Sequence, residues 1–171
     1  MHKPLSATLG AATLVVALTA CGNSTSPGSD AAGKDDAAKS QPPTAASAFT
    51  QISGKVPAAK LSGTITADND PNHLLGRPNE YTSKVTFTDS RVKASDVEGT
   101  KKGDVDRGGA VEVFANPTDA AARAKYIQAV TKSMPMFAEY DYVHGTVLVR
   151  VSHYLTPNQA RQYKTAAGGL S

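Results

Sequence analysis

The sequence predicts an α+β domain, in which a small antiparallel four-stranded sheet carries helices packed on one face, preceded by a signal peptide and a flexible linker. Three observations lead to this prediction. An apolar N-terminal run ends at a lone cysteine, a stretch without large apolar residues follows it, and short alternating segments then mix with proline-led helical segments. They divide the chain into a signal peptide (1–20), a lipidated cysteine with its tether (21–48) and a globular domain (49–171).

The first 20 residues have the pattern of a signal peptide. His2 and Lys3 form a short basic start, and an apolar run broken only by small polar residues continues to residue 20. The densest apolar part, residues 11–20, is about half the length that a membrane-spanning helix requires. The pattern therefore predicts a cleaved segment and not a permanent span.

The apolar run ends in Leu18, Thr19, Ala20 and Cys21, which resembles the lipobox of bacterial lipoproteins, where the cysteine receives diacylglycerol and the chain is cut before it. Cys21 is the only cysteine in the sequence, so no intrachain disulfide can form and an unmodified thiol would stay reactive. Two acyl chains give stable anchoring where one is marginal. We predict that Cys21 is lipidated and holds the protein on the extracytoplasmic face of the cell membrane. The alternatives are an ordinary secreted protein, cut after an A-x-A site, and an uncleaved anchor.

After Cys21 the chain changes character up to residue 48. Residues 22–48 are small, polar or charged, with no aromatic or branched aliphatic side chain. Such a segment cannot bury enough apolar surface to offset the entropy of ordering, so we predict a flexible tether. The formal net charge of +3, with no basic run longer than Lys101–Lys102, does not indicate a nucleic-acid partner.

The globular part opens with a predicted short helix over residues 68–78. Asp70 suits its N-cap, Pro71 its first helical position, and Gly76 with Pro78 its end. Residues 81–88 then alternate as a half-buried strand does. The polar, glycine-containing connection over residues 90–109 is expected to be mobile.

The second half carries stronger signals. Residues 110–115 predict a strand, and Asn116 with Pro117 predicts the start of a helix that ends before Pro135. Residues 139–142 and 146–153 predict a hairpin whose valines face the core, and Thr156 predicts the cap of a last helix. The predicted order is helix, strand, strand, helix, strand, strand, helix.

Several segments resemble small membrane-anchored lipoproteins of actinobacteria, a family of uncharacterised function. The resemblance spans roughly residues 67–164, and it implies an envelope location and no catalytic residue. The segments that carry it are Asp70-Pro71-Asn72-His73-Leu74-Leu75-Gly76-Arg77-Pro78, Tyr81-Thr82-Ser83-Lys84, Val111-Glu112-Val113-Phe114, Arg123-Ala124-Lys125-Tyr126-Ile127-Gln128, Glu139-Tyr140 and Leu155-Thr156-Pro157.

The best candidate cluster for chemistry is Asp68, Asp70 and His73, which would ligate a divalent metal if the loop folded them together. The favoured interpretation is that Asp70 is a helix cap and the other two are solvated, because the spacing matches no zinc motif and a site needs a further ligand. Asp104 and Asp106 lack the later glutamate of a calcium loop, so a polar turn is the favoured interpretation. His144 and His153 lie too far apart along a strand to be partners.

No nucleophile elbow and no phosphate-binding glycine motif occurs in the sequence. The tyrosines, Tyr140 and Tyr142 among them, could serve an interface, although capping the edges of a small core is the favoured interpretation. Arg77 and Arg107 could bind an anion. The sequence therefore predicts a non-enzymatic binding or interaction module without a cofactor, whose partner is an envelope protein or wall ligand. The alternative is an envelope enzyme such as a metal-dependent hydrolase using Asp68, Asp70 and His73.

Overall fold

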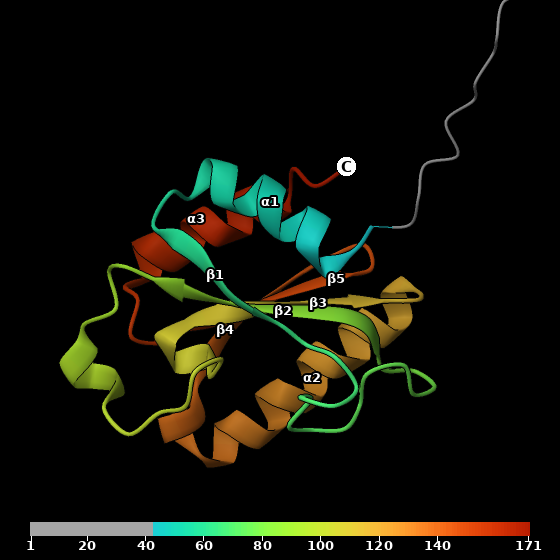
Figure 1. Cartoon of the computed structure of the whole chain (residues 1–171), viewed down its shortest axis with the longest axis horizontal. Helices are drawn as coiled ribbons and strands as arrows, with labels where there is room; N and C mark the ends of the chain where they lie inside the picture. Colours follow the sequence, from blue (N-terminus) through green and yellow to red (C-terminus); the bar gives the residue numbers. More distant parts are fainter. Residues whose placement is uncertain (1–42) are drawn as a thin grey trace, which may run out of the picture. The chain divides into compact units, whose positions relative to one another are not determined.

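A computed structural model describes residues 43–171, so the predicted signal peptide, Cys21 and the tether up to residue 42 lie outside the described residues. The fold is α+β, with three helices and five strands (Figure 1). The sheet is antiparallel throughout and has the order β1-β2-β3-β5-β4. In chain order the elements are α1 (Ala45–Lys55), β1 (Ala59–Thr64), β2 (Tyr81–Asp89), β3 (Gly108–Phe114), α2 (Pro117–Ser133), β4 (Glu139–His144), β5 (Val147–Ser152) and α3 (Pro157–Ala167).

The helices cover both faces of the sheet, which corrects the prediction of helices on one face. Helices α1 and α3 lie side by side over one face, and α2 lies on the other (Figure 1). The larger apolar core lies under α1 and α3 and includes Phe49, Phe87 and Tyr163, whose rings stack. A smaller core under α2 is built around Tyr81, Phe114 and Leu148. The molecule therefore has three layers.

Two elements were missed, and both lie at the start of the domain. Helix α1 begins at Ala45, inside the range predicted as tether, and Thr44 and Ser47 cap it reciprocally. Two of its alanines are buried, with Ala45 0% and Ala48 2% exposed. Strand β1 pairs along β2 and brings the sheet to five strands, one more than predicted. Alanine is typical of linkers and of close-packed helices alike, so only the packing reveals which of the two it forms.

The segment 68–78 is not the helix that the sequence predicted. It forms consecutive turns, with positive φ angles at His73 (52°) and Gly76 (76°) that interrupt any helical run. The Asp70 side chain binds the amides that a helix would otherwise direct to carbonyls, as described below. A short carboxylate that competes for backbone amides favours turns over helices.

Strand β2 lies where predicted, but both its faces are buried and the prediction of a half-buried strand is wrong. Val85 and Phe87 face the large core, whereas Lys84, only 5% exposed, faces α2. Strand β3 is buried at every residue, Glu112 included. The connection between β2 and β3 contains two short 3-10 turns, at Ala94–Val97 and Val105–Arg107.

The remaining elements confirm the sequence prediction. The Asn116 side chain accepts the Asp119 amide at the start of α2, and the Thr156 side chain accepts the Gln159 amide in a capping box on α3. Strands β4 and β5 form the predicted hairpin with Gly145 at positive φ (54°). The predicted valines of β5, Val147, Val149 and Val151, are all buried in the large core.

Candidate functional site

The candidate site is a cleft between α2 and the loop that precedes β2. It has a volume of about 350 Å³ and is lined by Leu74, Asn79 and Glu80 of the loop and by Ala122, Arg123 and Tyr126 of α2. Segments 70–78 and 123–128, two of those on which the sequence analysis based its expected resemblance, both contribute to its lining. The chain thus brings together two regions that are about 50 residues apart in the sequence.

One buried carboxylate, Asp70, organises the loop side of the cleft. Its oxygens accept the amides of Asn72 at 3.1 Å, Leu74 at 2.8 Å and Leu75 at 2.9 Å. The Tyr81 hydroxyl donates to the same carboxylate at 2.7 Å. Because one side chain binds three backbone amides of the loop, the loop presents Leu74 and the residues after it to α2 in a defined position.

The protonation of Asp70 follows from these bonds. Burial raises its pKa, but the hydrogen bonds from Tyr81 and the backbone amides favour the carboxylate more strongly and bring the pKa to about 2. The pKa of Tyr81 is raised in turn, by burial and by the adjacent Asp70 carboxylate. Asp70 is therefore ionised at neutral pH, and Tyr81 stays protonated as its donor.

The structure does not assemble Asp68, Asp70 and His73 into a metal site. Asp68 and His73 are exposed, whereas Asp70 is buried with both oxygens engaged by protein donors. Within residues 43–171 no group of three or more His, Cys, Asp or Glu side chains is placed to hold a metal ion. This geometry does not support a hydrolase mechanism through these three residues.

The α2 side of the cleft is connected to a buried charged network that the sequence analysis did not predict. Glu112 is 0% exposed and lies 2.9 Å from Lys84 Nζ, 3.1 Å from Arg150 Nη1 and 3.4 Å from Arg123 Nε. Burial alone would raise the pKa of Glu112, but the three cations outweigh it and lower the pKa to about 2. Arg123 therefore lines the cleft while bonded to an ionised carboxylate beneath it.

The network extends to β4, at the edge of the sheet. Arg150 donates to both oxygens of Glu139, at 2.7 and 2.8 Å. The two Asp141 oxygens are buried and have no hydrogen-bond partner within the described residues. Burial, and then the neighbouring Glu139 carboxylate, raise the pKa of Asp141, so this carboxyl holds its proton at neutral pH. In the sequence, Glu112 stands between two valines of a predicted strand. This charged residue in an apolar segment was the one sequence signal that could have revealed the network.

Exposed aromatic and apolar side chains lie at the cleft and just beyond the end of α2. Tyr126 is 62% exposed, and the Arg123 guanidinium lies 5.7 Å from its ring centroid. Beyond the helix, Met134 (42%), Met136 (72%) and Phe137 (54%) are also exposed. Exposed aromatic and methionine side chains are typical of surfaces that bind other molecules.

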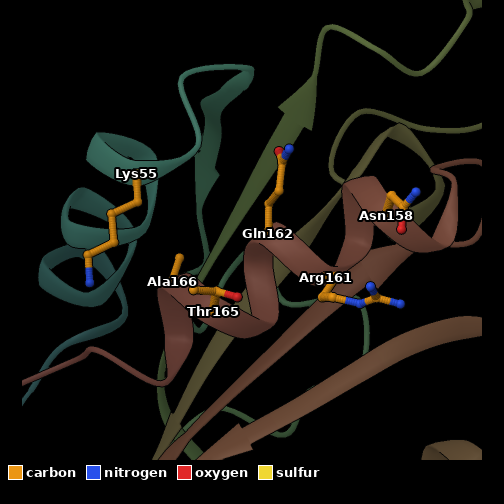
Figure 2. A pocket seen from close by; sticks show the side chains of 6 residues that line it. All are labelled: Lys55, Asn158, Arg161, Gln162, Thr165 and Ala166. Atoms are coloured by element: carbon orange, nitrogen blue, oxygen red, sulfur yellow. The ribbon is translucent and has the colours of Figure 1, made fainter.

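A second hollow lies on the opposite side of the sheet, between α1 and α3, with a volume of about 320 Å³. It is lined by Lys55 at the end of α1 and by the α3 residues Asn158, Arg161, Gln162, Thr165 and Ala166, and Figure 2 shows that the Lys55 and Arg161 side chains point away from each other. Its charged members are both cations. We call this surface the α1–α3 groove.

The other predicted residues have structural or solvated positions. Tyr140 and Tyr142 pack partly buried against the large core, in line with the edge-capping interpretation. Arg107 donates to the carbonyls of Val97 and Thr100, whereas Arg77 is exposed. His144 is exposed at the hairpin turn.

Comparison with known proteins adds no relative. No protein-family model matches the chain, and no curated protein and no solved structure matches it.

Proposed function

We propose that this protein is a non-enzymatic binding module of the cell envelope, anchored by lipid on Cys21, and that it binds an envelope protein or wall ligand in the cleft beside α2. The main support for this proposal is the cleft, an open hollow whose wall combines an exposed aromatic ring with charged and amide side chains. Binding sites commonly pair apolar contact area with a few fixed polar groups in this way.

The chemistry of the cleft fits an amphipathic ligand. The Tyr126 ring and Leu74 offer apolar contact, Asn79 offers an amide, and Arg123 and Glu80 offer a planar cation and a carboxylate. Because Arg123 is bonded to Glu112 and Leu74 is positioned through Asp70, these groups are held before a ligand arrives. A glycan or peptide segment of the envelope has the matching combination of apolar faces and hydrogen-bonding groups.

The anchor is supported by the sequence pattern around Cys21. None of the helices found between residues 43 and 171 is long and apolar enough to cross a membrane. The test is the intact mass and detergent partitioning of the protein from a lipoprotein-processing host, beside a Cys21→Ala variant. Acyl mass and detergent partitioning in the wild type alone support the anchor. If both proteins stay in the aqueous phase, the anchor is refuted.

The binding site is tested by photo-crosslinking in intact cells. A photoreactive amino acid replaces Tyr126 at the cleft or, as a matched control, Tyr154, which is also exposed but does not line the cleft. We expect a defined adduct from position 126 that is lost with Arg123→Ala. No adduct at position 126, or equal adducts at both positions, would contradict the proposed site.

A further inference from the structure

The α1–α3 layer is cationic and carries no acidic residue. Helices α1 and α3 contain Lys55, Arg161 and Lys164 and no aspartate or glutamate. Over residues 43–67 and 153–171 together there are four Lys or Arg side chains and no Asp or Glu, whereas residues 68–152 contain eleven basic and twelve acidic residues. The net positive charge of the described domain is therefore concentrated in the segments that contain α1, β1 and α3.

Within this layer, the α1–α3 groove presents groups suited to a phosphate. Lys55 lies toward one end, Arg161 and Asn158 lie toward the other, and Gln162 and Thr165 stand between them (Figure 2). Arg161 makes no hydrogen bond or ion pair with any of the described residues, and Lys55 donates only to the Gly169 carbonyl at 3.4 Å. Both cations are exposed, so they remain available to an external anion.

From this charge distribution and from the position of α1 in the chain, we infer that the α1–α3 groove and its basic surroundings dock on anionic phospholipid headgroups of the membrane to which the protein is anchored. The inference rests on the proposed lipid anchor. Docking in this orientation turns the sheet's opposite face, with α2 and its cleft, away from the bilayer (Figure 1).

The segment between Cys21 and α1 is short enough that a weak attraction to the bilayer suffices to dock the domain. Only 22 residues separate Cys21 from Thr44, the cap of α1, and a chain of that length spans at most about 80 Å. Helix α1 itself adds about 16 Å between its start and Lys55. Because an anchored domain is confined close to the bilayer, its effective concentration there is high. Each cation within a Debye length of about 10 Å of an anionic surface then raises the ratio of docked to undocked protein about fivefold.

The experiment measures the orientation of the lipidated protein in vesicles. Lipidation consumes the Cys21 thiol, so a Thr165→Cys variant carries one dye beside the groove, and a Gln128→Cys variant carries it on the exposed face of α2. Energy transfer to a headgroup-labelled lipid reports the proximity of each dye to the bilayer. Vesicles with phosphatidylglycerol are compared with vesicles of phosphatidylcholine alone, at low and high salt.

We expect strong transfer from position 165 in the anionic vesicles only, weakened by salt, and low transfer from position 128 throughout. Lys55→Glu combined with Arg161→Glu should reduce the ratio of docked to undocked protein by about 25-fold or more. The matched control, Lys125→Glu with Lys132→Glu, makes the same change in net charge on exposed positions of α2 and should leave the ratio unchanged.

Equal transfer from both dyes, or an equal effect of both charge reversals, would overturn the inference. A dye at position 165 that responds to soluble polyphosphate and not to anionic vesicles would also overturn it, and would identify a soluble anionic polymer as the partner. Flotation with the vesicles reports the lipid anchor separately. A failure of anchoring is therefore distinguishable from a failure of docking.

Discussion

Replacing Asp70 by alanine is the most direct test of how the cleft is built. The carboxylate is 1% exposed and accepts three backbone amides and the hydroxyl of Tyr81. Asp70→Ala leaves these four donors without their acceptor, so the turns between β1 and β2 lose the group that holds them. The loop side of the cleft should become disordered while the sheet survives.

The magnitude follows from the number and kind of bonds. A hydrogen bond to a charged group contributes about 1.5–3 kcal/mol, and loop amides regain part of this from water when the loop opens. We expect Asp70→Ala to lower the free energy of unfolding by about 3 kcal/mol and Tyr81→Phe to lower it by about 1.5 kcal/mol. The double variant should cost less than the sum, because both changes remove the same bond.

The pH dependence gives an independent check on Asp70. Its pKa of about 2 in the folded protein lies below the ordinary value of about 3.9, so the stabilisation is present above about pH 4 and is lost as the pH falls toward 2. We expect about 2 kcal/mol of this loss in the wild type and none of it in Asp70→Asn. Asp68→Asn, at an exposed position nearby, is the matched control.

The assay is urea unfolding followed by circular dichroism, with every variant carrying Cys21→Ala so that lipid does not interfere. The reasoning is refuted if Asp70→Ala costs less than about 1 kcal/mol, or if the wild type and Asp70→Asn lose stability equally between pH 4 and 2. Additive costs of the Asp70 and Tyr81 substitutions would show that the two side chains do not act through a shared bond.

Two further substitutions test the sheet. The pKa of Asp141 is raised to about 8, so between pH 4 and 8 the folded protein keeps a proton that the unfolded chain releases, and the stability of the wild type falls over this range. Asp141→Asn should remove this fall. In urea titrations at pH 8 the variant should be about 2 kcal/mol more stable than the wild type, a figure reduced for the partial exposure of the side chain. Parallel pH profiles would contradict this. Gly109→Ala would place a methyl group against the Arg150 carbonyl and the Phe87 ring, so it should lower the melting temperature sharply. Gly54→Ala adds a methyl group to α1 where there is open space, so it should raise the melting temperature slightly. Equal effects of the two substitutions would refute the close packing at β3.

The elements that could be predicted are those whose signals are local. Helices α2 and α3 start with a capping side chain followed by proline, and the hairpin of β4 and β5 has a glycine at its turn. Each signal acts within a few residues, so it operates before the rest of the chain is placed. The start of helix α1 escaped prediction because the buried residues of its first turn, Ala45 and Ala48, are alanines, and an alanine shows no preference for burial until a partner surface packs against it.

The candidate site was less predictable than the fold. Asp70 was singled out correctly as a residue that binds backbone amides, but the structure uses it in turns and not as a helix cap. The cleft joins the loop before β2 to α2, and nothing in the spacing of Leu74 and Tyr126 indicates that they meet. The basic groove likewise combines the end of α1 with α3.

What the sequence alone determined is local: the caps of α2 and α3, the hairpin of β4 and β5, and the position of β2. The tertiary structure decided the strand order, the placement of helices on both faces and the burial of Glu112 among Lys84, Arg123 and Arg150. The physical reason is that a buried charge is stable only with partners at the right distances. Here those partners come from separate strands and a helix, which meet only in the folded chain.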